Sequence, residues 1–419
     1  MEGIIIKDIV CRGNRLDIDF DVSKGLEQYF LPEHHFFAEY TCDISDVPSS
    51  VLVVPLLANL MPLAWLVDCI VWVNEIDRDF YRALPNIKRG FQEMYPDFQF
   101  RGSLIPAYVV DNRYEPQAEA ITLFTGGIDA TTTFLRHLDE SPILFNTNGW
   151  YTDDIREDAV YNADRNAIEA IAADFGVGSC FVRSNFGKFI RADAMTRFLQ
   201  KQKIRNSWWF GFQHSLAFLG CAAVAGYHFR TRKMYIASSY TFGEHVKLVS
   251  DPRIDSEVCV SSAVTLHDGY DMSRQDKVRF LCDTQKRLGK TFSLRVCSFN
   301  DHNCCACEKC LRTMLAIVAE GGDLQDFGFV LTDTLLNTVM EFLRNSVLEV
   351  DQAHEIFWKK IIGRMAENYD IISDHEVYHY LKDFDFAKAR RVWRLRYYRK
   401  NFFRIIQRRL GLGKRGDRM

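Results

Sequence analysis

The stretch that most constrains how this 419-residue chain can fold runs from Ala120 to Leu138. An apolar, strand-forming run, Ile121–Phe124, stops at Gly126 and Gly127, and a segment with helical spacing follows. The pattern predicts a strand, a tight glycine turn and a helix. Residues without a Cβ let a phosphate approach the backbone, and the first N–H groups of the helix then point at it. The competing interpretation is an ordinary strand-to-helix turn with Asp129 near the cap.

Downstream of the glycine turn, strands and helices alternate. Strands are predicted at Ile143–Phe145, Cys180–Val182 and Met234–Ala237, with helices at 156–175 and His214–Ala225 between them. Alternating βα units of this length predict an α/β fold with a doubly wound parallel sheet. In such a sheet the ligand binds at the carboxyl ends of the strands, where the glycine turn lies.

The length of the chain predicts more than one domain. We expect an N-terminal α+β domain over 1–116, the α/β core over 117–323, a helical domain over 324–387 and a basic amphipathic tail over 388–419. The net charge of −3 hides a strong asymmetry. The tail carries 13 Lys and Arg with one acid, so an acidic body precedes a basic tail.

One apolar stretch, Val51–Asn74, is long enough to raise the question of a transmembrane span. Pro55 and Pro62 would break a continuous helix there, and Asp68 would lie unpaired in hydrocarbon. A buried helix and strand is therefore the preferred interpretation. The first residues lack a basic region and a long apolar run, so no secretory signal is expected.

Between the last predicted core strand and the cysteine-rich region, Ser238–Asp271 reads as a long polar loop and a candidate substrate lid. Ser273 and Asp276 have the spacing of a capping box that opens an amphipathic helix. A strand is expected at Phe292–Cys297, directly before the cysteines.

The chain has twelve cysteines, and five of them fall within fourteen positions. Four have C-x-x-C-type spacing: Cys297, Cys304, Cys307 and Cys310. This spacing predicts a closed, structural Zn(Cys)4 site, with Lys309 and Arg312 placed to offset its negative charge. An iron–sulfur cluster and unliganded buried cysteines are the alternatives, and Cys305 is a surplus thiol that could replace Cys304.

The glycine turn resembles the Ser-Gly-Gly-x-Asp-Ser pyrophosphate loop of the ATP pyrophosphatase superfamily. Together with the late cysteine cluster, it resembles the 7-cyano-7-deazaguanine synthase family of queuosine biosynthesis, a zinc-containing branch of that superfamily. The similarity covers roughly Ile121 to Val318. Thr125 and Ala130 stand where the family has serines, so a hydroxyl is missing at position 130 only.

The resemblance implies an adenine nucleotide alpha hydrolase-like core and assigns roles to the residues of the turn. Thr125, Gly126 and Gly127 would cradle pyrophosphate, Asp129 would hold Mg²⁺, and Thr131 would stand near the phosphates. The reaction also needs cations, and the candidates are Lys188, Lys203, Arg205 and Lys247. The expected catalytic residues are Asp129, Thr125 and Arg205.

The implied activity is that of an ATP-dependent ligase. It would adenylate a small-molecule carboxylate, release pyrophosphate and transfer the acyl group to ammonia or an amine, with ATP, Mg²⁺ and structural Zn²⁺ as cofactors. Because the chain has segments outside the similarity, the substrate could instead be another carboxylate, such as one on a sugar, a peptide or a protein. The rival functions are a tRNA-modifying thiolase of the same superfamily and a nucleotide-binding scaffold with reduced catalysis.

The tail mixes arginines with aromatic side chains, as in Trp393, Arg394, Tyr397 and Tyr398. Such a helix suits an anionic membrane surface or a partner protein, and nucleic acid ranks lower. A helix packed on the acidic body is the alternative. The expected location is the cytoplasm, with the inner face of the membrane as a peripheral site, and a homodimer is one option for assembly.

Overall fold

The computed structural model describes residues 2–149, 154–244, 246–297, 300 and 302–409, with side chains described except at 154–157, 352–353 and 400–409. Residues 410–419 of the expected basic tail lie outside this range. The chain divides into two compact units, Met1–Thr284 and Gln285–Met419, which we call unit 1 and unit 2. The predicted boundary at residue 116 falls inside unit 1, and the predicted core is divided between the two units.

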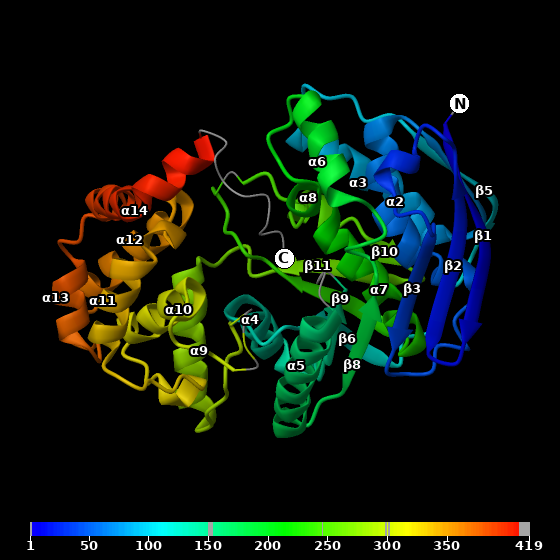
Figure 1. Ribbon diagram of the computed structural model, residues 1–419. Helices are drawn as coiled ribbons and strands as arrows, with labels where there is room; N and C mark the ends of the chain where they lie inside the picture. Colours follow the sequence, from blue (N-terminus) through cyan, green and yellow to red (C-terminus); the bar gives the residue numbers. More distant parts are fainter. Residues whose placement is uncertain (1, 150–153, 245, 298–299, 301, 410–419) are drawn as a thin grey trace. The chain divides into compact units, whose positions relative to one another are not determined.

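Unit 1 is built on one sheet of eleven described strands, in the spatial order β10-β11-β9-β6-β7-β8-β3-β2-β1-β4-β5 (Figure 1). The strands are β1 (Gly3–Arg12), β2 (Arg15–Val22), β3 (His35–Tyr40), β4 (Ile70–Asp77), β5 (Ser103–Val110), β6 (Ala118–Leu123), β7 (Ile143–Asn148), β8 (Ser179–Ser184), β9 (Thr231–Ala237), β10 (Cys259–Val260) and β11 (Ala263–Asp268). The helices are α1 (Ser49–Leu52), α2 (Val54–Val67), α3 (Arg78–Met94), α4 (Ile128–Arg136), α5 (Asp154–Phe175), α6 (Ala192–Lys201), α7 (His214–His228), α8 (Pro252–Asp255) and α9 (Arg274–Leu288), whose last turn belongs to unit 2.

The strands β11, β9, β6, β7 and β8 are mutually parallel, as the alternating pattern predicts. From β6 the chain moves outward through β7 and β8, and then returns to the other side of β6 through β9 and β11. The strand order therefore reverses beside β6. The α/β class and the parallel sheet are confirmed, and the arrangement is compatible with a Rossmann-like core.

The expected lid between Ser238 and Asp271 is wrong in one respect, because this segment contains the fifth parallel strand. β11 pairs with β9 over five consecutive residues, from Val264↔Lys233 to Asp268↔Ala237. Val264 and Leu266 are 45% and 38% exposed, whereas Thr265 is buried. The strand is hard to recognise in the sequence because its buried positions hold the small Ala263 and the polar Thr265, while its larger apolar side chains lie on the more open face.

The N-terminal strands extend the parallel sheet rather than forming a sheet of their own. β3 pairs antiparallel with β8, in the register Ala38↔Ser184 and Tyr40↔Val182. β1, β2 and β3 are joined by antiparallel pairing, and β1, β4 and β5 by parallel pairing. The predicted mixture of helices and strands is present, but its hydrogen bonds run without a break into the α/β core.

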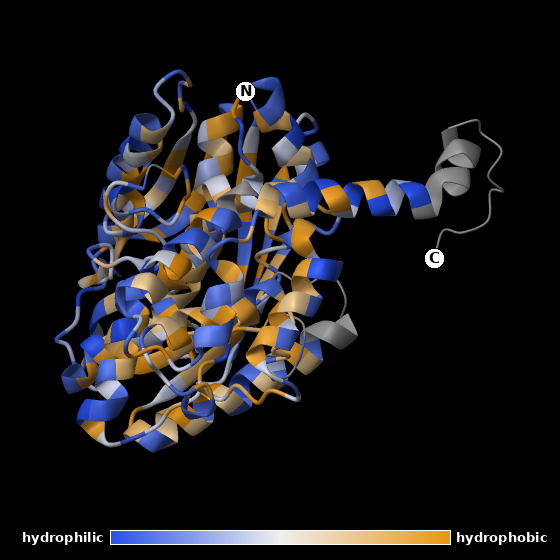
Figure 2. Ribbon diagram, turned by 90° about the vertical axis from the view of Figure 1, so that its left-hand side faces the viewer, coloured by the Kyte–Doolittle hydropathy of each residue, from blue (hydrophilic) through white to orange (hydrophobic). Residues whose placement is uncertain are grey.

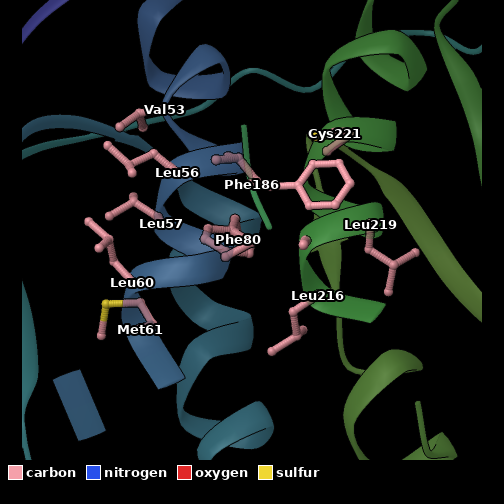
Figure 3. Packing of buried hydrophobic residues seen from close by; sticks show 14 of the residues in the cluster. Val53, Leu56, Leu57, Leu60, Met61, Phe80, Phe186, Leu216, Leu219 and Cys221 are labelled. Atoms are coloured by element: carbon pink, nitrogen blue, oxygen red, sulfur yellow. The ribbon is translucent and has the colours of Figure 1, made fainter. Parts of the chain in front are cut away.

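The apolar stretch Val51–Asn74 forms the buried helix α2 followed by β4. Figure 3 shows buried side chains of α2 (Leu56, Leu57 and Leu60) and of α7 (Leu216 and Leu219), which belong to one hydrophobic cluster. The two helices approach closely at Gly220, where a Cβ would lie 2.8 Å from that of Ala58 and 3.0 Å from the Pro55 Cα. Among the described residues, no helix has the length and apolar character needed to cross a membrane.

The helices of unit 2 are α10 (Glu308–Ala319), α11 (Leu335–Asn345), α12 (Gln352–Glu367), α13 (His375–Leu381) and α14 (Phe386–Arg409). The strand expected at Phe292–Cys297 is wrong. This segment has no regular secondary structure and joins no described sheet, and Leu294 N instead donates to the backbone oxygen of Phe327 at 3.0 Å. This backbone bond and the hydrogen bonds of Val296 N and Leu294 O with the Asn303 side chain take the place of a neighbouring strand.

Candidate functional site

The glycine turn lies at the carboxyl end of β6, where the strand order reverses. Gly126 has φ +73°, a conformation that favours glycine, and Gly127 is the N-cap of α4. The nine-residue helix begins at Ile128, so its first N–H groups have no partner within the helix. Thr125 is exposed, whereas Ala130 is only 7% exposed. The position that lacks the family's hydroxyl is thus packed against protein.

Asp129, in the first turn of α4, is bound by two cations. Its Oδ2 accepts from Arg274 Nη2 at 2.8 Å, and its Oδ1 accepts from Lys277 Nζ at 3.1 Å. The Lys277 side chain is 2% exposed and also donates to the Ser238 carbonyl oxygen, just beyond β9. This arrangement places two positive charges from α9 beside a helix N-terminus, which is an environment suited to a polyanion.

The four expected cations differ in their surroundings. Lys203 and Arg205 are exposed, and Lys247 Nζ lies 5.0 Å from the centroid of the Tyr95 ring. In the part of the chain described, none of these three bonds to Asp129. Lys188 is half-buried in the segment after β8. Sequence reasoning missed Arg274 and Lys277, although their i,i+3 spacing directly after the capping serine puts them on one helix face.

Asn and Thr side chains near the turn add buried polar groups. Asn146 Nδ2 donates to Phe124 O at 2.9 Å and so fixes the start of the turn. Thr131, which is 2% exposed, has a hydroxyl oxygen with no hydrogen-bond partner among the described residues. A buried hydroxyl of this kind requires an explanation, and a bound ligand or water would supply the partner.

The predicted capping box at the start of α9 is confirmed. Ser273 N donates to Asp276 Oδ2 at 3.1 Å, and Asp276 N donates to Ser273 Oγ at 3.2 Å. The box fixes the first turn of the helix that carries both cations.

Replacing the capping serine should weaken this helix start. Ser273→Ala removes the acceptor for Asp276 N, and we expect a loss of about 1 kcal/mol in the free energy of unfolding. Denaturant titration followed by circular dichroism measures it. Ser273→Thr keeps the hydroxyl and should remain close to the wild type. Equal losses for both variants would contradict a capping role.

A second carboxylate, Asp268, ends β11 and ties it to α4. Its oxygens accept from Thr133 Oγ1 at 2.8 Å and pair with His137 Nε2 at 3.2 Å, and Arg136 Nε lies 3.7 Å away. Burial alone would raise the pKa of Asp268, but the hydrogen bonds from His137 and Thr133, with the charge of Arg136, hold it below its ordinary value. The ionised form is thus the one that stabilises the fold.

The stabilisation by Asp268 should therefore depend on pH. Because its pKa is lowered on folding, its contribution is complete above the ordinary aspartate pKa of about 4 and is lost as the pH falls through the lower folded value. Asp268→Asn should cost about 2 kcal/mol at neutral pH, and the gap from wild type should shrink in acid. Chemical denaturation across pH tests it. Asp271→Asn, at a 67% exposed neighbour paired with Arg136, is the control.

The four predicted cysteine ligands come together in unit 2. The Sγ atoms of Cys297, Cys304, Cys307 and Cys310 all lie within 4.8 Å of one another, and those of Cys304 and Cys310 are 3.9 Å apart. Four thiolates around Zn²⁺ at about 2.3 Å would be separated by about 3.8 Å. The donor set and spacing therefore fit zinc. The surplus thiol of Cys305 instead approaches the carbonyl oxygen of Asn303 at 3.4 Å.

Two features position the cysteines: the first turn of α10 and the hydrogen bonds of the Asn303 side chain. Cys307 is the N-cap of α10 and Cys310 lies in its first turn, so the helix dipole favours negative thiolates. The hydrogen bond from the Cys310 thiol lowers the pKa of Cys307 to about 5. Asn303 Oδ1 accepts from Val296 N at 3.0 Å and from Cys297 N at 3.3 Å. The Asn303 side chain thereby holds the first ligand against the other three.

The expected role of Arg312 is not what its contacts indicate. Arg312 Nε pairs with Glu308 at 2.9 Å, and Glu308 also accepts from Trp358 Nε1 at 3.0 Å. Arg312 further lies over the Phe357 ring, 5.0 Å from its centroid. These contacts join α10 to α12, so Arg312 serves the packing of the metal-bearing helix. Lys309 is exposed.

Comparison of the chain with protein-family models, with curated proteins and with solved structures gave no match.

Proposed function

We propose that this chain is an ATP-dependent ligase that activates a substrate carboxylate as an acyl-adenylate and transfers the acyl group to ammonia or an amine. The observation that carries the proposal is the convergence of Arg274 and Lys277 on Asp129 at the glycine turn. Two cations beside the first N–H groups of α4 would form a cradle for the charge that leaves ATP as pyrophosphate.

In the proposed reaction, a carboxylate oxygen attacks the α-phosphorus of ATP and the bond from that phosphorus to the pyrophosphate oxygen breaks. The amine nitrogen then attacks the acyl carbon, AMP leaves with its oxygen, and the nitrogen loses a proton to solvent. Lys277 and the backbone of Gly126 and Gly127 would stabilise the departing charge, and Thr125 would add a hydroxyl. Mg²⁺ would neutralise phosphate oxygens, and a zinc ion held by the four cysteines would be structural.

A second candidate function has one specific observation in its favour. Both oxygens of Asp129 already accept from cations, so a Mg²⁺ ion would compete with Arg274 and Lys277 for this carboxylate. A chain in which Asp129 stays paired would bind nucleotide without turning it over. This is the nucleotide-binding scaffold, and Ala130 in place of the family's serine is consistent with it.

Pyrophosphate release from ATP and Mg²⁺ separates the two functions. The assay uses full-length protein of known zinc content, ammonia and a panel of carboxylates that includes 7-carboxy-7-deazaguanine. Substrate-dependent release that falls about 100-fold or more in Asp129→Ala would support the ligase. Asp283→Ala, at an exposed position of α9, is the matched control and should keep wild-type activity. ATP binding without release over the whole panel would favour the scaffold.

A further inference from the structure

Among the side chains that the structure describes, those that anchor helix α14 of unit 2 lie at its start. Arg390 pairs with Glu355 at 2.6 Å and donates to Val350 O at 2.8 Å. Trp393 Nε1 donates to Asn345 O at 2.7 Å. Phe386 is 2% exposed and packs edge-on against Trp358. The first two turns of α14 are therefore part of the helical packing of unit 2.

Beyond Trp393 the helix leaves this packing. Every described side chain from Arg394 to Arg399 is exposed, including Leu395 at 64%, Tyr397 at 47% and Tyr398 at 57%. Figure 2 shows this part of α14 running clear of the other helices of its unit, with hydrophobic and hydrophilic residues side by side. Large apolar side chains at such exposure indicate a surface that has a partner elsewhere.

The sequence of the helix combines charge with an apolar stripe. Six Lys and Arg and no acid lie between Lys388 and Arg399. In the sequence, Leu395, Tyr398, Phe402 and Ile406 follow one another at intervals of three, four and four positions. Basic residues recur at every fourth position on another face, at Arg396, Lys400, Arg404 and Arg408. The helix thus has an apolar stripe at helical spacing beside a basic one.

We propose that α14 lies on the surface of a membrane rich in anionic phospholipid. Arginines pair with lipid phosphates, while leucine and aromatic side chains enter the boundary between headgroups and acyl chains. The apolar stripe decides against nucleic acid, because Leu395 and Tyr398 would gain little from a phosphate backbone. The exposure of the described side chains from Arg394 to Arg399 decides against a helix that packs along this part on the other helices of unit 2.

Binding of the full-length protein to lipid vesicles tests the proposal. Vesicles of phosphatidylcholine mixed with phosphatidylglycerol should bind the wild type, and pure phosphatidylcholine should bind it much less. Replacing Arg391, Arg394 and Arg399 by Glu should weaken binding to the anionic vesicles about 100-fold or more, and added salt should weaken the wild type similarly. The matched control replaces Lys286, Arg287 and Lys382 by Glu, which changes the net charge equally on exposed positions of the same unit.

A second variant separates insertion from simple charge attraction. Leu395→Ser with Tyr398→Ser keeps every charge and should weaken vesicle binding about 10-fold, because the apolar contact with the acyl boundary is lost. Circular dichroism checks that each variant keeps its helix content. The proposal is overturned if the wild type ignores anionic vesicles, if both charge variants lose binding equally, or if the wild type binds duplex DNA or RNA but not lipid.

Discussion

Cys310→Ser is expected to abolish zinc binding and to unfold much of unit 2. Cys310 is fully buried in the first turn of α10, and its thiol lies 3.9 Å from that of Cys304. Structural zinc contributes about 10–16 kcal/mol of binding free energy in small zinc domains, which exceeds the total stability of most domains. The zinc content of the purified protein and its thermal unfolding, with and without a chelator, measure the effect.

The neighbouring cysteine gives the matched control for this experiment. Cys305→Ser changes a buried thiol next to the cluster, but this thiol faces a backbone carbonyl rather than the other four. The variant should keep its zinc and most of its stability. If the two variants lose stability equally while the wild type contains no zinc, the cluster is an ordinary buried group of thiols. Iron and a brown colour in the wild type would instead indicate an iron–sulfur cluster.

Lys277→Met is expected to reduce pyrophosphate release by about 100- to 1000-fold, if the proposed ligase function holds. Methionine preserves most of the volume of the side chain but removes the charge that faces Asp129 and the Ser238 carbonyl. The Lys277 side chain is 2% exposed, so water does not replace its charge after the substitution. Of the two described cations that pair with Asp129, only Arg274 then remains. The rate per molecule of folded protein, with the ATP dissociation constant measured separately, distinguishes catalysis from binding.

Arg279→Met is the companion variant for this prediction. Arg279 lies two residues further along α9 and is exposed, so the substitution removes a charge from the same helix without touching the glycine turn. It should leave the rate and the stability close to wild type. Unchanged release in Lys277→Met, together with normal folding, would remove this lysine from the proposed site and leave Arg274 as the candidate cation.

The elements that the sequence predicted well are those whose signal is local. The glycine turn, the capping box at Ser273 and the spacing of the four cysteines each depend on residues within a few positions of one another, and the structure has all three. The parallel order of the core strands was predictable as well, because alternating βα units allow few other topologies.

The elements that the sequence did not predict depend on distant pairing. β11 carries a buried Thr265 and looks like a polar loop until β9 lies beside it. The cations at Asp129 come from a helix about 145 residues away, and nothing in a single sequence pairs Asp129 with Arg274 rather than with Arg205. The segment before Cys297 has the composition of a strand, but its backbone bonds to the Asn303 side chain and to Phe327 O rather than to another strand.

The antiparallel junction of β3 with β8 has a consequence for how the protein is made. The hydroxyl oxygen of Thr41, which follows β3, accepts a hydrogen bond from Phe181 N of β8, 140 residues further along the sequence. A ribosome that adds about 5–20 residues per second needs roughly 7–30 s to cover that distance. During this time the edge of β3 that β8 will cover has no neighbour, although β1 and β2 are already present to pair on its other side. Because an open strand edge can pair with other chains, the nascent N-terminal strands are most exposed to wrong pairing before β8 emerges.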